Sequence, residues 1–508
     1  MKNQVSKSLY ILFGLIIFWS CSDKLEENEG FTLASDVDYT NTSDMILPLI
    51  GAYERAYTRG WEDFPLISVR GDDVNAGGLG DQQDFAETDL YNYNKDYWMY
   101  NSVWQNFYKD IIDINANVSA INLYKEYASG ADLARADQYV AECKVLQGWM
   151  HLQLSRLWSD LFIMETNVVS DNLANGVKSK DEIMQYVSDL MDDAIPFLPD
   201  ARPNERTDVN GGVTKYTALA VKAMANLELG NYQEVATATG QIIGSNKFSL
   251  FSDYYELFKK PGELSNESLF EMQFSDYGTP DGSPANQYLW AFFGPQGWTP
   301  AVSGIGGGWG FYEPSIKYIK FMLDRGEQTR LQTSVLFTNR GIAEIQSDPA
   351  YATLPAWISN TTPDGDIIND YARAMFASGK HYLPSNQITD GRTSYGSGKN
   401  MIVIRYAEVL LMYAEALVNG ASGNGMTADA AVNLVRNRAG LGSLSGVTIN
   451  QVMDEKFAEM AMEWGIRYYD MIRLQRYDEL SYDGRIFSAA KAYLPYPQAQ
   501  VDALPLEP

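Results

Sequence analysis

Residues 401–476 constrain the fold most, because their apolar side chains recur at the three- and four-residue steps of amphipathic helices. We expect a first helix that stops at Gly420, a second between the N-cap residue Thr427 and Gly440, and a third that Asn450 can cap and Gly465 can interrupt. The apolar faces comprise Ile404, Ala407, Leu411, Ala414 and Val418 in the first helix and Met453, Phe457, Met460 and Trp464 in the third. This block therefore predicts helices that stack on those of the first half.

Charged residues also lie among the apolar residues of this block, notably Arg436, Arg438, Glu463, Arg467, Asp470 and Arg473. Glu463 and Arg467 are four residues apart with the acid nearer the N-terminus, which is the favourable order within a helix. We interpret the charged residues as structural ion pairs that lock one helix to the next. The alternative is a catalytic acid/base pair of Glu463 and Asp470, but helix-packing pairs are commoner and the sequence implies no pocket there.

The first half of the chain, residues 46–250, also has helical periodicity. Residues 215–244 are typical of a helix, a tight turn at Gly230 and Asn231, and a second helix, with alanines that allow the paired helices to approach closely. This unit resembles a tetratricopeptide repeat, and several helix pairs of similar length accompany it. The first half is therefore expected to form a tetratricopeptide-like helical solenoid.

The N-terminus has the pattern of an export signal. Lys2 and Lys7 precede a run of 11 apolar residues, 9–19, which is too short to span a membrane and fits a secretory signal peptide. Ser20 and Cys21 then resemble a bacterial lipobox, so we expect residues 1–20 to be removed and Cys21 to carry the lipid anchor. Residues 21–45 would form an acidic tether. The alternative is an ordinary signal peptide that is cut elsewhere.

Residues 251–400 are rich in residues that interrupt regular structure. They contain 17 of the 41 glycines and 10 of the 19 prolines, so we expect an irregular subdomain of loops and short strands. They are also aromatic, with Trp290, Trp298 and Trp309 close together in the sequence. The glycines around Trp309 do not form a phosphate-binding loop, because no lysine follows at the required spacing. Long loops on a rigid helical frame are typical places for function.

A second aromatic cluster lies upstream, with Trp98 and Asn101 at its end. Sugar rings have an apolar C–H face and a polar rim, so Trp and Tyr side chains can cover the face while Asn, Asp or Arg side chains bond to the hydroxyl groups. The candidate glycan-binding residues are Trp98, Asn101, Trp290, Trp298 and Trp309. The structural alternative, which holds for most single aromatic residues, is that they pack the core of a loop-rich subdomain.

Composition excludes several other functions. The net charge of −26 repels nucleic acid. The only two histidines are His151 and His381, which rules out a multi-histidine metal site and makes a histidine-based catalytic triad improbable. Asp364, Asp366 and Asp370 lack the spacing of a calcium loop, and we interpret them as a solvated turn that could bind calcium adventitiously. We therefore expect no metal site and no cofactor.

Three stretches carry a resemblance to a known family. The run VRNRAGL, the run EKFAEMAMEWGIRYYDMIRLQR and the later LPYP at residues 494–497 resemble the C-terminal signature of the SusD/RagB family. Trp104, Tyr108, Ile112 and Asn115 also fall where that family places them. The resemblance implies a mainly α-helical protein: a tetratricopeptide-like solenoid with a large irregular loop-rich subdomain inserted before the last helices, at residues 401–508. It also implies that glycans bind where an early loop meets that subdomain.

Members of that family are surface lipoproteins that bind nutrients, usually glycans, beside a SusC-like TonB-dependent transporter. The resemblance thus implies a non-enzymatic, lipid-anchored protein of the outer membrane that captures oligo- or polysaccharide outside the cell. Three alternatives stay open. One is a surface glycoside hydrolase or lyase, which needs two carboxylates facing each other across an aromatic cleft. The second is a helical scaffold, and the third is a relative whose cargo is peptide.

Overall fold

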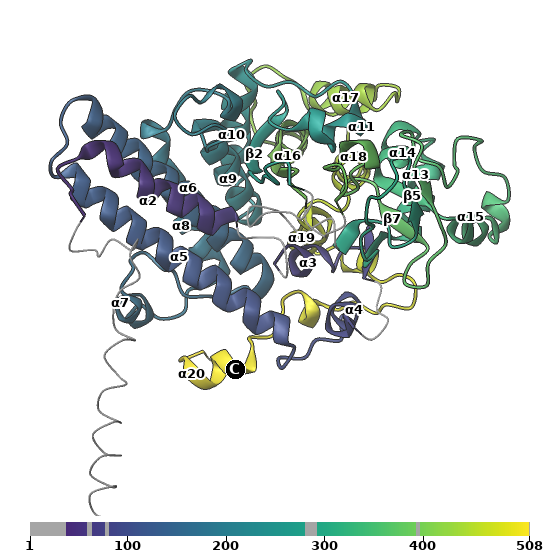
Figure 1. Cartoon of the computed structure of the whole chain (residues 1–508), viewed down its shortest axis with the longest axis horizontal. Helices are drawn as coiled ribbons and strands as arrows, with labels where there is room; N and C mark the ends of the chain where they lie inside the picture. Colours follow the sequence, from purple (N-terminus) through teal and green to yellow (C-terminus); the bar gives the residue numbers. More distant parts are fainter. Residues whose placement is uncertain (1–36, 58–62, 77–80, 280–291, 393–396, 507–508) are drawn as a thin grey trace, which may run out of the picture.

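The computed structural model describes residues 37–57, 63–76, 81–279, 292–392 and 397–506. Helices dominate it, as the sequence predicts (Figure 1). The long helices of the first half are α2 (Ile46–Tyr57), α5 (Trp98–Lys125), α6 (Ala131–Trp158), α8 (Lys180–Ala194), α9 (Lys215–Glu228) and α10 (Tyr232–Gly244). Those of the C-terminal part are α16 (Tyr406–Val418), α17 (Ala428–Arg438), α18 (Ile449–Met460) and α19 (Ile466–Arg473). Shorter helices are α3 (Asp63–Ser68), α4 (Gln83–Asp89), α7 (Val169–Ala174) and α20 (Gln498–Ala503).

Neighbouring helices pack in sequence order through most of the solenoid. α5 packs on α6, α6 on α8, α8 on α9, and α9 on α10, and the C-terminal helix α16 then packs on α10. The turn between α9 and α10 contains Gly230 at a φ of 70°, a value that favours glycine. The predicted helix–turn–helix unit at residues 215–244 is therefore confirmed, and so is the stacking of the 401–476 block on the first half.

The segment between the two helical parts is less regular. It contains the helices α11 (Tyr254–Leu257), α13 (Ile316–Asp324), α14 (Thr329–Ser334) and α15 (Asn339–Gln346). Its strands and their partners are β1 (Val74–Ala76), β2 (Ser268–Met272), β3 (Trp298–Thr299), β4 (Tyr312–Pro314), β5 (Val335–Phe337), β6 (Ile367–Ile368), β7 (Phe376–Ser378) and β8 (Met401–Arg405). Among the described residues they form four two-stranded antiparallel sheets, β1–β4, β2–β8, β3–β6 and β5–β7.

Two of these sheets fix the irregular segment to the rest of the chain. β2 and β8 stand at its two ends and pair with each other, so the segment leaves and re-enters the helical frame at one place. The early loop is the connection between α3 and α4 that contains β1. The pairing of β1 with β4 joins this early loop to the irregular segment, with Asn75 opposite Glu313. The early loop and the irregular segment therefore meet in the structure, where the resemblance leads one to expect a binding site.

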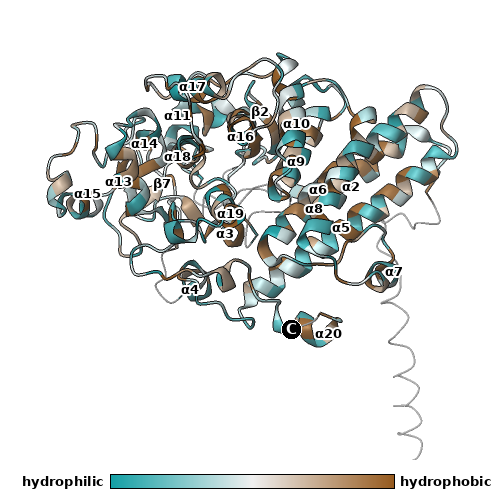
Figure 2. Ribbon diagram, turned by 180° about the vertical axis from the view of Figure 1, so that it is seen from behind, coloured by the Kyte–Doolittle hydropathy of each residue, from teal (hydrophilic) through white to brown (hydrophobic). Residues whose placement is uncertain are grey.

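Apolar side chains form one main core and smaller satellite cores. The main core contains residues from the first half and from the C-terminal helices, and a second core lies under α13 and α14 and includes Phe457 of α18. Figure 2 shows apolar residues concentrated where α6 and α8 lie together and around α3 and α19 in the middle of the molecule. Among the described residues, no helix is both long enough and apolar enough to cross a membrane.

Three local predictions are wrong. The first C-terminal helix begins at Tyr406, because Met401–Arg405 forms strand β8; its β-branched run suits a strand, and β2 supplies the hydrogen-bonding partner. The third helix is capped by Thr448, whose side chain accepts a hydrogen bond from the N–H of Gln451, and not by Asn450. It also ends at Met460, before Trp464. Thr427 caps α17 as predicted.

Candidate functional site

A row of aromatic rings links Trp98, at the start of α5, to Trp309 in the irregular segment. The Trp98 ring meets Phe85 of α4 edge-on at 6.2 Å between centroids, and Phe85 meets Phe311 at 5.9 Å. Phe311 then lies 5.9 Å from Phe292, which lies 5.6 Å from Trp309. Each contact has the edge-to-face geometry and the spacing that aromatic pairs prefer. Two tryptophans about 200 residues apart in the sequence are thus joined through three phenylalanines.

Exposure divides this aromatic row into a support and a surface. Phe85, Phe292 and Phe311 are buried, whereas Trp98 is 49% exposed and Trp309 is half-buried against the main core. Because the three phenylalanines are buried, they hold the neighbouring tryptophan rings in place, at little further cost in side-chain entropy. Trp98 is therefore a fixed, solvent-facing platform at the junction of the early loop and the irregular segment.

Trp298 lies in the same loop system as Trp309. Two backbone hydrogen bonds, from Phe311 to Phe292 at 2.7 Å and from Gly310 to Gly294 at 2.8 Å, hold residues 307–311 against residues 292–298. Trp298 itself packs edge-on against Tyr382, with 6.3 Å between the ring centroids, and is half-buried beside a satellite core. The ring of Trp298 thus contributes to the stability of the loop as well as to its surface.

Asn101 is one turn beyond Trp98 on α5, and its side-chain oxygen accepts a hydrogen bond of 2.8 Å from Nε2 of Gln500 on α20. That contact ties the C-terminal helix to α5, so at least one polar atom of Asn101 has a structural role. Trp290 and Cys21 lie outside the described residues.

An ion pair between Asp81 and Arg373 adds polar groups beside the aromatic row. The carboxylate and guanidinium are 2.5 Å apart, and the guanidinium carbon lies 5.6 Å over the ring of Phe311. The pair joins the early loop to the irregular segment at the row itself. Sequence reasoning missed Asp81, Phe85 and Arg373. No sequence motif marks these three residues. The one available signal was the position of Phe85 between a polar stretch and an aromatic stretch of the sequence.

A second cluster, made of charged side chains, lies at the centre of the molecule. Arg405 at the end of β8 contacts three carboxylates: Glu463 at 2.7 Å, Glu267 at 2.9 Å and Glu459 at 2.5 Å. Arg438 contacts Glu267 and Glu459 as well. Burial raises the pKa of Glu459, but the neighbouring arginines outweigh that effect and lower the pKa to about 2. These groups are therefore ionised pairs that hold β8, α17 and α18 together.

The pairing of Glu463 with Arg467 predicted from their spacing is wrong. Between α18 and α19 the backbone has positive φ at Met462, Trp464 and Gly465, so the two residues are not on one continuous helix. Glu463 pairs with Arg405 and with Lys380, both at 2.7 Å. Arg467 instead binds residues outside this group.

The other charged residues that were predicted to form ion pairs each take part in one. Arg467 contacts Asp72 at 2.7 Å and Glu479 at 2.5 Å. Asp470 contacts Lys456 and Arg473, each at 2.6 Å, and Arg436 contacts Glu455 at 2.9 Å. Burial raises the pKa of Asp470, but Lys456 and Arg473 offset this and lower it to about 2. Asp470 is thus an ionised partner of two cations and lacks the raised pKa of a general acid.

Sequence comparison places these features in a family. Residues 222–502 match the SusD family, which is more than half of the chain. The chain belongs to the SusD family.

The relatives and solved structures that are similar to this chain match it over nearly its whole length. A "SusD-like protein" of Bacteroides ovatus is 23% identical over 93% of this chain and 83% of its own length. "SusD-like protein P2" of Formosa agariphila is 24% identical over 94% of this chain and 92% of its own. The structure of surface glycan-binding protein A from Bacteroides thetaiotaomicron in complex with laminarihexaose has a TM-score of 0.73 and 22% identity, covering 91% of this chain and 97% of that one. A laminarin-binding SusD-like protein has a TM-score of 0.74 and 19% identity over 91% and 97%.

The aspartates of residues 364–370 have structural roles in this SusD-family chain. Asp366 is fully buried and accepts hydrogen bonds from the N–H of Ala301 at 2.7 Å, from the N–H and hydroxyl of Ser385 at 2.9 Å and 2.6 Å, and from the hydroxyl of Tyr382. The interpretation of this stretch as a solvated turn is therefore wrong for Asp366. Among the described residues, no group of three or more His, Cys, Asp or Glu side chains is placed to hold a metal ion.

Proposed function

We propose that this chain is a cell-surface lipoprotein that binds oligo- or polysaccharide and delivers it to a partner TonB-dependent outer-membrane transporter. The observation that carries the proposal is the aromatic row from Trp98 to Trp309, at the junction of the early loop and the irregular segment. Membership of the SusD family supports the same function. The activity is binding, and it requires no cofactor.

The chemistry of the aromatic row suits a sugar. Trp98 offers an exposed indole face, and a flat apolar face is what the C–H side of a pyranose ring packs against. The Asp81 side chain, which is 57% exposed, supplies an acceptor nearby for hydroxyl groups, and the buried guanidinium of Arg373 holds that carboxylate in place. A rigid platform loses little entropy on binding, so affinity does not need a deep pocket.

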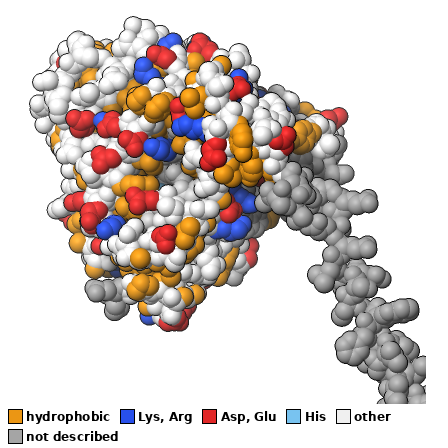
Figure 3. Space-filling model, turned by 90° about the vertical axis from the view of Figure 1, so that its left-hand side faces the viewer, with side chains coloured by type: hydrophobic (Ala, Val, Ile, Leu, Met, Phe, Trp, Pro, Cys, Tyr) orange, Lys and Arg blue, Asp and Glu red, His pale blue; other side chains and the backbone are white. Residues whose placement is uncertain are grey.

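The charge of the molecule favours a neutral cargo over nucleic acid. The chain carries a net charge of −26, and on the face drawn in Figure 3 acidic side chains are spread between basic and apolar ones without a large basic patch. Nucleic-acid binding depends on neutralising phosphates with lysine and arginine, which this surface does not favour.

A glycan array on the soluble chain that starts after Cys21 tests the binding proposal. Laminarin-type oligosaccharides are the first ligands to try, because two structural neighbours are described as binding them. We expect Trp98→Ala and Trp309→Ala to lose the signal. Tyr127→Ala is the matched control: Tyr127 is 58% exposed and lies beyond the opposite end of α5, about 40 Å from Trp98 at 1.5 Å per residue. An equal loss in all three variants, or binding to no glycan, would contradict the proposal.

The three alternatives give different results in simple assays. A surface hydrolase or lyase would release reducing sugar from polysaccharide, and we expect the purified chain to release none above a heat-treated control. A scaffold would keep its protein partner while binding no glycan, and a relative with peptide cargo would bind peptides in place of glycans. Reducing-sugar release that Trp98→Ala abolishes would replace the binding proposal with an enzymatic one.

The lipid anchor and the transporter are tested in cells. Two acyl chains on Cys21 would hold the chain stably to the outer membrane, and tethering would raise the local ligand concentration at the transporter. We expect Cys21→Ala to release the protein from the membrane fraction. We also expect the wild-type chain to co-purify with a TonB-dependent transporter. Unchanged fractionation of the Cys21→Ala variant would refute the anchor without affecting the glycan proposal.

A further inference from the structure

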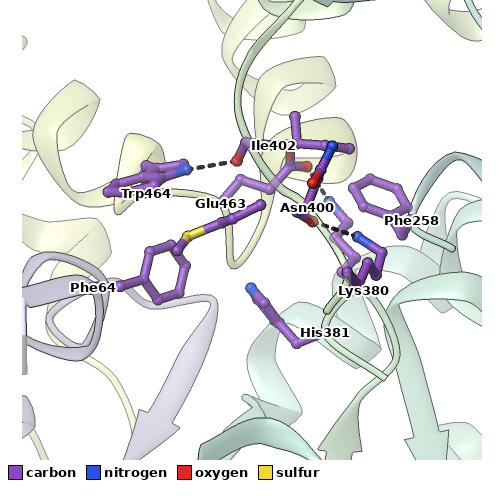
Figure 4. Close-up of a pocket in the computed structure, with 10 residues that line it drawn as sticks. Phe64, Phe258, Lys380, His381, Asn400, Ile402, Glu463 and Trp464 are labelled. Atoms are coloured by element: carbon purple, nitrogen blue, oxygen red, sulfur yellow. Dashed lines mark hydrogen bonds and ion pairs between the residues drawn. The ribbon is translucent and has the colours of Figure 1, made fainter. Parts of the chain in front are cut away.

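A small pocket lies where the early helix α3, the irregular segment and the C-terminal helices meet (Figure 4). Its volume is about 40 Å³, enough for one to three water-sized particles, since one needs at least about 10–15 Å³. Its walls are Phe64, Phe258, Lys380, His381, Lys399, Asn400, Met401, Ile402, Glu463 and Trp464. The aromatic row of the glycan proposal is not part of this lining.

Lys380 belongs to the frame of the pocket. Its ammonium donates to the carbonyl oxygens of Glu459 at 2.8 Å and Ala461 at 2.9 Å and to the carboxylate of Glu463 at 2.7 Å. These three contacts use all of its donors. Glu463 in turn contacts Arg405, so the carboxylate in the pocket wall is shared between two cations.

Lys399 has donors to spare. Its ammonium donates to the carbonyl oxygen of Asn400 at 3.0 Å, and among the described residues no carboxylate lies within ion-pair distance of it. Glu263 and Glu271 attract the Lys399 ammonium electrostatically, but each accepts a hydrogen bond from Asn400. An ammonium has three donors, and Lys399, which lines the pocket, uses one of them on Asn400 among the described residues.

Other basic groups add to the positive charge around the pocket. Lys259 is fully buried, and its ammonium donates to the carbonyl oxygen of Gly379 at 2.7 Å. His381 stacks on Phe293 with 4.0 Å between centroids, its Nδ1 bonds to the hydroxyl of Ser378, and Figure 4 shows the ring facing the pocket. Burial and the neighbouring lysines lower the pKa of His381, so its imidazole is neutral. In the tautomer whose Nδ1 accepts from Ser378, the neutral imidazole carries its proton on Nε2 and can donate from there.

We propose that this pocket is a binding site for a small monovalent anion of halide size, held by the ammonium of Lys399 and the imidazole of His381. A partly buried cation whose donors are not all used, and which makes no ion pair among the described residues, is stabilised by an anion beside it. The pocket is too small for a sugar ring, and the excess of donors over acceptors suits an anion. Burial lowers the pKa of Lys259 to about 7, the direction expected for an ammonium that lacks a counter-ion.

The bound anion would stabilise the junction of three parts of the chain. Phe64 comes from the first half, Lys399 and His381 from the irregular segment, and Glu463 and Trp464 from the C-terminal signature. A ligand that binds only the folded protein raises its stability by an amount that grows with ligand concentration relative to Kd.

Thermal unfolding of the soluble chain tests the proposal. The protein is titrated with sodium chloride or sodium bromide while sodium gluconate keeps the ionic strength constant. We expect the unfolding temperature to rise with halide and then to follow the logarithm of its concentration. Lys399→Met should remove that dependence. Lys95→Met, at an exposed lysine, should keep it and serves as the matched control for the lost charge.

An equal halide response in wild type and Lys399→Met, or no response in wild type, would overturn the proposal. Because Lys399→Met could also unfold the protein, a second measurement uses the wild type alone. Crystals grown in sodium bromide should show an anomalous bromide peak in contact with Nζ of Lys399. If bromide occupies surface sites but gives no peak in the pocket, only water binds in the pocket. That result would also overturn the proposal.

Discussion

The guanidinium of Arg467 holds the carboxylate of Asp72 by two hydrogen bonds, of 2.7 Å and 3.0 Å, although 395 residues separate the two in the sequence. The bond is bidentate, which gives it direction as well as strength. It fixes the C-terminal helix α19 to the early loop that contains β1, and β1 in turn pairs with β4 just beyond Phe311 in the sequence. The C-terminal signature therefore supports the proposed binding surface without touching it.

Breaking this pair should destabilise the protein strongly. Asp72 is fully buried, so Asp72→Asn leaves the charge of Arg467 poorly compensated, and we expect a loss of about 3–5 kcal/mol in the free energy of unfolding. Lys317→Met should cost less, because the Lys317 side chain that also contacts Asp72 is 32% exposed. Urea unfolding followed by tryptophan fluorescence measures both. Equal losses would mean that the bidentate pair has no special role.

A double-mutant cycle separates the observed pairing of Glu463 from the one that spacing suggests. Arg405 and Glu463 are in direct contact, so Arg405→Met and Glu463→Gln should show a coupling energy of about 1–3 kcal/mol. Glu463→Gln and Arg467→Met should be nearly additive, because these two residues belong to separate groups of ion pairs. A larger coupling in the second cycle than in the first would contradict the structure.

Glu313 and Glu408 should each stabilise the protein more as pH falls from 7 to 4.5. Burial raises the pKa of Glu313 and Glu408 to about 7 each, above the ordinary 4.5, so in the folded protein these two groups take up protons between pH 7 and 4.5 that they do not take up in the unfolded chain. Their contribution to the free energy of unfolding therefore rises as pH falls through that window, whereas the lowered pKa of His381 acts in the opposite direction below pH 6.5. The pKa of Glu459 and that of Asp470 are lowered to about 2, so their contribution is lost as pH falls from about 4.5 towards 2.

Urea unfolding of the wild type and of Glu313→Gln at a series of pH values checks the contribution of Glu313. Glu313→Gln keeps an oxygen that can accept from the N–H groups of Met375 and Phe376 but cannot ionise, so the stability difference between wild type and variant should grow in favour of the wild type as pH falls from 7 to 5. Glu126→Gln changes an exposed glutamate and is the matched control. A stability difference between wild type and Glu313→Gln that does not change with pH would contradict the raised pKa.

Trp98→Ala should separate binding from stability. Its side chain is 49% exposed, so the substitution should leave the free energy of unfolding nearly unchanged. If the indole is the sugar platform, the substitution should weaken the binding free energy by about 1.4 kcal/mol or more. Titration calorimetry should then show a Kd that is at least about tenfold higher. Trp98→Tyr, which keeps an aromatic face, should recover most of the affinity. Recovery in Trp98→Leu as well would indicate simple apolar contact.

Sequence pattern predicted the regular parts of this fold because each depends on local physics. The helix pair around Gly230, the cap at Thr427 and the break at Gly465 follow from spacing and from residue type. It failed at Met401–Arg405, where the partner strand β2 lies more than 100 residues earlier, and at Glu463, where the helix on which the spacing rule depends is interrupted. Local patterns do not report such distant partners.

The candidate site was predictable only in outline. The sequence identified Trp98 and Trp309 as candidates, but their connection runs through Phe85, which no motif marks. Exposure likewise depends on packing between distant segments: Asn101 bonds to Gln500, and Trp298 packs on Tyr382. Aromatic residues of a platform and of a core have the same composition, and only the folded chain distinguishes them.

Gly465 should tolerate no side chain. Its φ is 67°, where a residue with a Cβ is strained by about 1–2 kcal/mol, and an added Cβ would stand 2.4 Å from the carbonyl oxygen of Ile67 in α3. That oxygen already accepts a hydrogen bond from the hydroxyl of Tyr469, so α3 cannot retreat without losing the bond. Gly484 is the matched control, since its φ is 79° and nothing lies within 4 Å of its added Cβ. We expect Gly484→Ala to cost only the backbone strain and Gly465→Ala to cost clearly more in urea unfolding. Equal costs would mean that α3 moves freely away from the break between α18 and α19.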